Sequence, residues 1–106
     1  MPGLSRVLRR VRALAAERRV RFTLKALREL ATLDLDATDA CEVIEALKPG
    51  DFVQRLVSDA TGEGMYVFKP RIAETWIYLK LVLRDGCIVV SFHADEAGEN
   101  DEEEGR

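Results

Sequence analysis

The spacing of the apolar residues changes near the middle of this 106-residue chain, and this change limits the fold more than any other feature. Apolar residues recur at helical spacing up to Leu47, but they fall in short, strand-like runs after the turn sequence at 48–51. The pattern predicts helices at about 4–17, 24–33 and 36–47, and strands at 52–57, 65–69, 74–83 and 87–92. Three helices followed by four strands indicate an α+β domain in which an antiparallel sheet is covered by helices on one face.

The dipeptide Asp85-Gly86 is a strong signal for a two-residue hairpin loop, and such a loop sets the register of the last two strands. The predicted pairs are Leu83–Ile88, Leu81–Val90 and Leu79–Phe92 on the helix-covered face, and Val82–Val89, Lys80–Ser91 and Tyr78–His93 on the other face. Side chains directly opposite each other lie about 4.5–5.5 Å apart at Cβ, so the only histidine lies beside Tyr78 and near Lys80. This face is either a functional surface or an open sheet face whose polar side chains meet water.

Charge is distributed very unevenly along the chain. The first 30 residues hold nine basic side chains against two acidic ones, whereas residues 94–106 hold seven acidic side chains against one arginine. Because residues 94–106 contain no large apolar side chain, we expect a disordered acidic tail there, after a single domain at 1–93. The tail is interpreted either as solubilising or as a screen that competes with phosphates. The Arg-rich start is either a solvated helix face or a nucleic-acid patch.

The sequence contains no signal for a membrane span, for secretion or for a metal site. No apolar run approaches the length of a membrane span, and no apolar segment follows the basic N-terminal residues as in a secretory signal. Cys41 and Cys87 lie far apart and belong to no metal-type cluster, which is typical of reduced, partly buried thiols. We therefore expect a cytoplasmic protein that binds neither a membrane nor a metal ion nor another cofactor.

Several segments, taken in order, resemble one known family. The segments are Phe68-Lys-Pro-Arg71, Tyr78-Leu-Lys80, the Asp-Gly hairpin and Ile88-Val-Val-Ser-Phe92, preceded by Val20-Arg21, Thr23, Leu35, Cys41, Val43-Ile44 and Asp51-Phe52. Over residues 4–93 this set is similar to the MqsR family, the mRNA-cleaving toxins of bacterial toxin–antitoxin pairs. The resemblance implies a RelE-like fold with a small, strongly twisted antiparallel sheet. It also implies metal-independent, sequence-specific endoribonuclease activity on messenger RNA, and an antitoxin protein that neutralises the chain.

The resemblance also assigns individual residues. Tyr78 matches the functional tyrosine of the family, and Lys80 and Arg71 match basic positions. The chain departs from the family pattern at three places, since Gln54 and His93 replace lysines and Met65 replaces a glutamine. Either the activity is altered, or His93 takes over the acid–base work.

RNA cleavage without a metal requires a base for the 2′-hydroxyl, stabilisation of the five-coordinate phosphate and an acid for the leaving oxygen. His93 is the predicted general acid or base, because an ordinary imidazole titrates near neutral pH. Tyr78 would orient the phosphate or share the proton transfer, and Lys80 and Arg71 would neutralise phosphate charge. The predicted RNA-binding residues are Gln54, Arg55, Lys69 and Trp76, with Trp76 or Tyr66 stacking on a base.

Two other functions remain open at this point. In the first, the altered positions mark a catalytically degenerate binding or regulatory module of the same fold, whose sheet face binds a protein such as gyrase or a nucleic acid. In the second, the chain binds nucleic acid through Arg9, Arg10 and Arg12 of the first helix.

Overall fold

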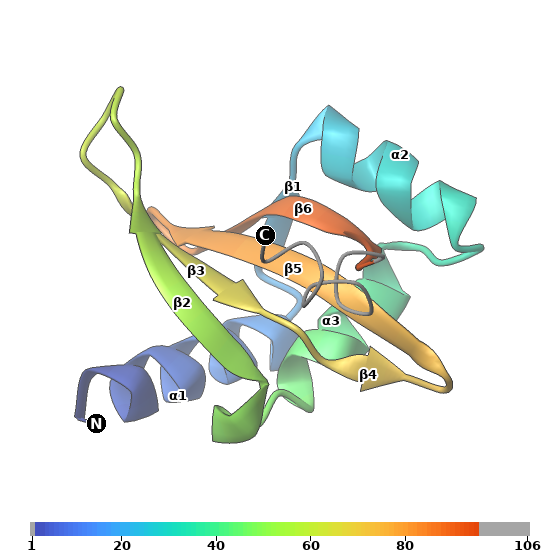
Figure 1. Ribbon diagram of the computed structural model, residues 1–106, viewed down its shortest axis with the longest axis horizontal. Helices are drawn as coiled ribbons and strands as arrows, with labels where there is room; N and C mark the ends of the chain where they lie inside the picture. The colour runs from blue at the N-terminus through green and yellow to red at the C-terminus, as the bar shows by residue number, and fades with distance from the viewer. Residues whose placement is uncertain (1, 96–106) are drawn as a thin grey trace, which may run out of the picture.

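A computed structural model describes residues 2–95 (Figure 1). The helices of this part are α1 (Pro2–Ala16), α2 (Leu24–Thr32) and α3 (Ala37–Glu45), followed by a single 3₁₀ turn at Pro49–Asp51. The strands are β1 (Val20–Phe22), β2 (Phe52–Val57), β3 (Gly64–Phe68), β4 (Arg71–Ile72), β5 (Thr75–Leu83) and β6 (Cys87–Ala94). The predicted α+β class is confirmed, and the fold is compatible with a RelE-like architecture.

Two helices begin where local sequence signals predict them to begin. The Thr23 hydroxyl accepts a hydrogen bond from the Ala26 N–H at 3.0 Å and caps α2. Asp36 and Asp39 cap α3 reciprocally, because each carboxylate accepts the backbone N–H of the other residue at 2.9–3.0 Å. These bonds satisfy backbone donors that the first turn of a helix leaves unpaired.

The sheet is mixed rather than purely antiparallel, which corrects one expectation. Its strand order is β1-β6-β5-β3-β2, with β4 paired to β5, and β1 runs parallel to β6 through the pair Val20–Cys87. Neither β1 nor β4 was predicted, because each has three residues or fewer and exists only through a partner strand. The two outer strands are unequal, since β1 has three residues and β2 has six.

The β5–β6 hairpin agrees with the predicted register at its far end and differs near its loop. Tyr78–His93, Leu79–Phe92 and Lys80–Ser91 pair as predicted. Three residues, 84–86, form the loop instead of two, and Val90 is an extra, bulged residue that restores the register. Cys87 and Val89 therefore face the core, and the predicted pairs Leu83–Ile88, Leu81–Val90 and Val82–Val89 are wrong.

The loop is longer because Arg84 leaves the strand ladder. Its backbone N–H donates to the Gly86 carbonyl, and its guanidinium binds both carboxylate oxygens of Glu63 at 2.5–2.6 Å. Asp85 and Gly86 have φ angles of 51° and 120°, so the turn depends on residues that tolerate the left-handed region.

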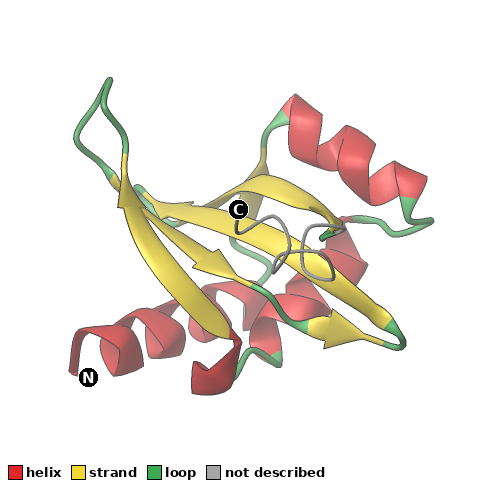
Figure 2. Cartoon of the chain, viewed as in Figure 1, coloured by secondary structure: helices red, strands yellow, loops and turns green. Residues whose placement is uncertain are grey.

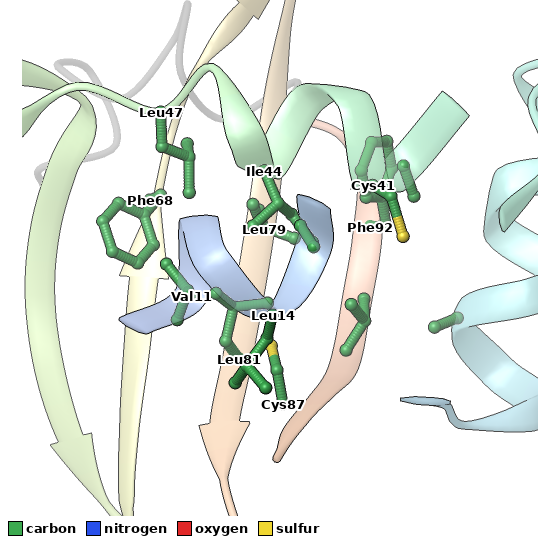
Figure 3. Close-up of a cluster of buried hydrophobic side chains, with 14 of the residues drawn as sticks. Val11, Leu14, Cys41, Ile44, Leu47, Phe68, Leu79, Leu81, Cys87 and Phe92 are labelled. Atoms are coloured by element: carbon green, nitrogen blue, oxygen red, sulfur yellow. The ribbon is translucent and has the colours of Figure 1, made fainter. Parts of the chain in front are cut away.

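The hydrophobic core lies between one face of the sheet and the helices α1 and α3 (Figures 2 and 3). Its largest fully buried side chains include Phe68, Phe92, Leu79, Leu81, Ile44 and Val11. The sequence predicted that all three helices cover this face, but α2 does not. It runs alongside the outer edge of β6 (Figure 1), with Ala26 and Leu30 buried in the same core.

Both cysteines are fully buried rather than partly buried, and neither forms a disulfide. Burial raises the pKa of the Cys87 thiol to about 12 and also raises the pKa of the Cys41 thiol. Burial therefore disfavours the thiolate, which is the reactive form of Cys87. No helix within residues 2–95 is long and apolar enough to cross a membrane.

Two residues of the predicted acidic tail, Ala94 and Asp95, belong to the folded domain instead. Ala94 pairs with Ile77 as the last residue of β6, and Asp95 is 5 % exposed with its N–H donating to the Trp76 carbonyl at 2.8 Å. The remaining predicted tail, 96–106, lies outside the described residues.

Candidate functional site

The sheet face opposite α1 and α3, called here the cationic face, is built from two adjacent rows of side chains. One row crosses four strands and contains Gln54, Val67, Lys80 and Ser91. The next row contains Tyr78 and His93, on β5 and β6. Because successive residues of a strand point to opposite faces, Leu79 and Phe92 between these rows point into the core.

Tyr78 and His93 are in direct contact. Their rings are stacked, with centroids 5.1 Å apart and planes within 9° of parallel. The Lys80 ammonium lies 6.0 Å from the centroid of the Tyr78 ring. A phenol, an imidazole and an ammonium group therefore occupy neighbouring positions on one rigid antiparallel pair.

A hydrogen bond to the backbone determines which ring nitrogen of His93 can take a proton. Nδ1 lies 2.9 Å from the carbonyl oxygen of Ala94. A carbonyl oxygen only accepts hydrogen bonds, so this contact requires a proton on Nδ1. In the neutral ring Nε2 then carries the lone pair and is the nitrogen that can take a proton.

Helix α2 adds two charged residues beside this pair. Lys25 Nζ lies 3.0 Å from Ser91 Oγ and 2.9 Å from Glu29 Oε2, and Glu29 Oε1 accepts the Phe92 N–H at 2.9 Å. Burial acts to raise the pKa of Glu29. The hydrogen bonds from Phe92 and Lys25, with the charges of Lys25 and His93, nevertheless hold this pKa below its ordinary value of 4.5.

This lowered pKa makes stability depend on pH in a definite direction. A carboxyl group whose pKa is lower in the folded chain stabilises the fold when ionised, and this stabilisation is lost as pH falls through the folded pKa. At neutral pH we expect Glu29→Gln to reduce the free energy of unfolding by about 1 kcal/mol, the difference between a charged and a neutral hydrogen bond. The difference should shrink steadily below pH 4.5. Urea unfolding at a series of pH values measures it.

The control for this experiment is Glu42→Gln, which changes an exposed glutamate of α3. It should follow the wild-type pH profile closely. A constant difference between wild type and Glu29→Gln at all pH values would show that Glu29 is not stabilised in its ionised form.

Three further predicted residues lie at the end of the cationic face. Trp76 is 44 % exposed, and the Arg71 guanidinium carbon lies 5.4 Å from the centroid of its ring, while Arg71 also pairs with Glu74 at 3.3 Å. Lys69 Nζ lies 3.1 Å from the buried Asp95 carboxylate, and this carboxylate neutralises the charge of Lys69. Arg71 and Trp76 are thus accessible beside the Tyr78–His93 pair, whereas Lys69 is engaged within the chain.

Arg55 is not part of this face, contrary to its predicted place among the RNA-binding residues. It pairs with Tyr66, which pairs with Leu81, and this row points to the helix side of the sheet. The Arg55 guanidinium carbon lies 5.8 Å from the centroid of the Tyr66 ring. The two residues line an apolar pocket of about 470 Å³ with Gly3, Leu4, Val7 and Phe52. A bulge at Val53 shifts the register of β2 and puts Arg55 opposite Tyr66, so both residues lie on the face of the sheet away from the Tyr78–His93 pair.

The arginines in α1 and directly after it have separate roles. Arg12 donates through Nε and Nη2 to the Leu47 carbonyl, and Arg18 pairs with Glu45 at 2.6 Å, so both tie α1 to α3 or the turn after it. The basic patch then reduces to Arg6, Arg9, Arg10 and Arg19, which line a shallow depression of about 360 Å³. The nucleic-acid surface predicted at Arg9, Arg10 and Arg12 therefore loses Arg12.

The sequence reasoning missed four residues of this region, namely Lys25, Glu29, Ser91 and Asp95. Lys25 and Glu29 are visible in the sequence as an i,i+4 pair on a helix, but their position beside β6 depends on the tertiary fold. Among residues 2–95 no group of three or more His, Cys, Asp or Glu side chains is arranged to hold a metal ion.

These features define a small α+β protein with helices on one sheet face and a cationic face that carries a stacked tyrosine–histidine pair. No curated protein matches the chain. A family model described as motility quorum-sensing regulator, toxin of MqsA, matches residues 5–94. The chain therefore belongs to the MqsR toxin family, among the toxins of toxin–antitoxin systems, and the resemblance found in the sequence is confirmed.

Proposed function

We propose that this toxin is an endoribonuclease that cleaves messenger RNA by side-chain acid–base chemistry. The observation that carries the proposal is the stacked pair of Tyr78 and His93, with Nε2 of the imidazole left to take a proton. The pair lies next to Lys80 on a sheet face that also presents Arg71 and Trp76. Binding of RNA and proton transfer would thus occur on the same surface.

The proposed reaction is an internal transfer of the phosphoryl group. Nε2 of His93 takes the proton of the ribose 2′-hydroxyl, and the 2′-oxygen forms a bond to the adjacent phosphorus. The bond from phosphorus to the 5′-oxygen breaks, and the Tyr78 hydroxyl gives a proton to the leaving oxygen. The products are a 2′,3′-cyclic phosphate and a 5′-hydroxyl end. Transfer of the proton from His93 to Tyr78 through water restores the enzyme.

The neighbouring cations would stabilise the charge that develops on the phosphate. The Lys80 ammonium lies 6.0 Å from the centroid of the Tyr78 ring, and Arg71 has a planar guanidinium suited to two phosphate oxygens. The exposed face of Trp76 would stack on a base of single-stranded RNA. Gln54, at the β2 end of the row that also contains Lys80 and Ser91, would contact the RNA strand.

The proposal includes a protein partner. The family description pairs the toxin with MqsA, and we infer that a cognate antitoxin binds this chain in the cytoplasm and blocks cleavage. A purified antitoxin added in equal amount should then stop the reaction.

The test incubates the purified protein with a long structured RNA in EDTA and maps the new ends. Discrete cuts with 5′-hydroxyl ends are the expected result, since the proposed chemistry needs no divalent cation. Intact RNA, both alone and with translating ribosomes present, would contradict the proposal. That result would favour a binding module that acts on its partner without cleaving RNA.

A further inference from the structure

Lys25 reaches the cationic face from a different part of the fold than the other cations. It belongs to α2, which runs alongside β6 (Figure 1), and its ammonium contacts Ser91 Oγ at 3.0 Å and Glu29 Oε2 at 2.9 Å. An ammonium group donates three hydrogen bonds. Two are used by these neighbours, and the side chain is 61 % exposed, so the third donor faces solvent.

Ser91 is the second unusual group at this place. Its residue is only 4 % exposed, and it lies directly opposite Lys80 in the long row of the cationic face. Because an ammonium can only donate, Ser91 Oγ accepts the bond from Lys25 and keeps its own hydrogen to donate. Ser91 therefore has the Lys25 ammonium as its hydrogen-bond donor and Lys80 as its neighbour on the adjacent strand.

The spacing of the rows relates these groups to the proposed reaction. Ser91 is two residues from His93 on the same strand, and such residues on one face are about 7 Å apart. That distance is also the approximate span between successive phosphates of an extended RNA strand. A phosphate held over the edge of the Tyr78–His93 stack would therefore place the next one near Lys80 and Ser91.

We propose that Lys25, Ser91 and Lys80 form a subsite for the phosphodiester next to the one that is cleaved. The inference rests on the proposed RNA cleavage and assigns the direction of the substrate, which runs along β5 and β6 from the Tyr78–His93 row to the Lys80–Ser91 row, beside α2. The two ammonium groups and the hydroxyl hydrogen of Ser91 supply donors, which suit phosphate oxygens. Glu29 keeps Lys25 in position through one carboxylate oxygen while its other oxygen holds the Phe92 N–H.

The test measures binding without cleavage, using a short single-stranded RNA whose 2′-hydroxyls are all methylated. Loss of one phosphate contact lowers the slope of log K against log salt by about 0.7 for a single strand. We expect Lys25→Gln to show this change and to bind roughly tenfold more weakly, the size of one charge-assisted hydrogen bond. Lys25→Arg should keep the wild-type slope, because it keeps a donor cation.

Arg28→Gln is the matched control, since it removes one positive charge from an exposed position of the same helix. Its slope should equal that of wild type. Equal losses for Lys25→Gln and Arg28→Gln, or a lower melting temperature for Lys25→Gln with an unchanged slope, would overturn the subsite. A wild-type chain that binds no RNA would overturn the proposed function as well, whereas wild-type binding that Lys25→Gln leaves intact overturns the subsite alone.

Discussion

His93→Ala is expected to reduce the rate of RNA cleavage by roughly 10²–10⁴-fold, the usual contribution of a general acid or base. The folded state should be almost unaffected, because the ring lies on the cationic face, outside the hydrophobic core. Its interactions are the stack on Tyr78 and the hydrogen bond to the Ala94 carbonyl. Single-turnover cleavage with saturating enzyme measures the chemical step, and thermal unfolding measures stability.

Two variants make this result specific. His93→Gln keeps a polar side chain that cannot carry a proton, so it should lose as much activity as alanine. Arg55→Gln removes a cation from the opposite face of the sheet and should leave cleavage within a factor of a few of wild type. Full activity in His93→Gln would exclude His93 as the proton carrier.

Phe92→Ala is expected to lower the free energy of unfolding strongly. Phe92 is fully buried and its neighbour in sequence, His93, points to the other side of the sheet. Removing a buried phenyl ring costs about 3–5 kcal/mol, which is a large part of the 5–15 kcal/mol that stabilises a typical domain. Urea unfolding should show a much lower midpoint, and much of the chain should be unfolded at moderate temperature.

Phe92→Leu provides the comparison, because it keeps the side chain apolar and removes less volume. It should cost well under half as much as alanine. If Phe92→Ala lowered the free energy of unfolding by less than about 1 kcal/mol, the ring would not be packed in the core as described. The register of β6 would then be wrong as well. Adjacent substitutions at 92 and 93 thus separate stability from activity.

Local signals predicted the parts of the fold that depend on neighbouring residues. The helix starts predicted near 24 and 36, which Thr23 and Asp36 cap, and the strand predicted at 52–57 follow from side chains within a few positions. The pairing of Tyr78 with His93 was also predicted, although the loop was one residue longer than expected. That error did not propagate, because the bulge at Val90 compensates for it.

The parts that were not predicted depend on contacts between distant segments. β1 is a strand only because its three residues pair with β6, and Lys25 joins the cationic face only because α2 lies against that strand. Arg55 was predicted to bind RNA, but the bulge at Val53 changes which residues of β2 share a side and puts it on the helix side of the sheet. Asp95 was assigned to a tail by composition, although its carboxylate pairs with Lys69.

The inequality of the two sheet edges has a consequence for self-association. Along β6, the edge beyond β1 offers no free template, since Glu29 already holds the Phe92 N–H and α2 runs beside the strand. β2 is therefore the long edge that remains able to accept another strand. A fibre grows only from units that are open at both ends, so within the part of the chain that the structure describes, pairing through β2 would stop at two molecules.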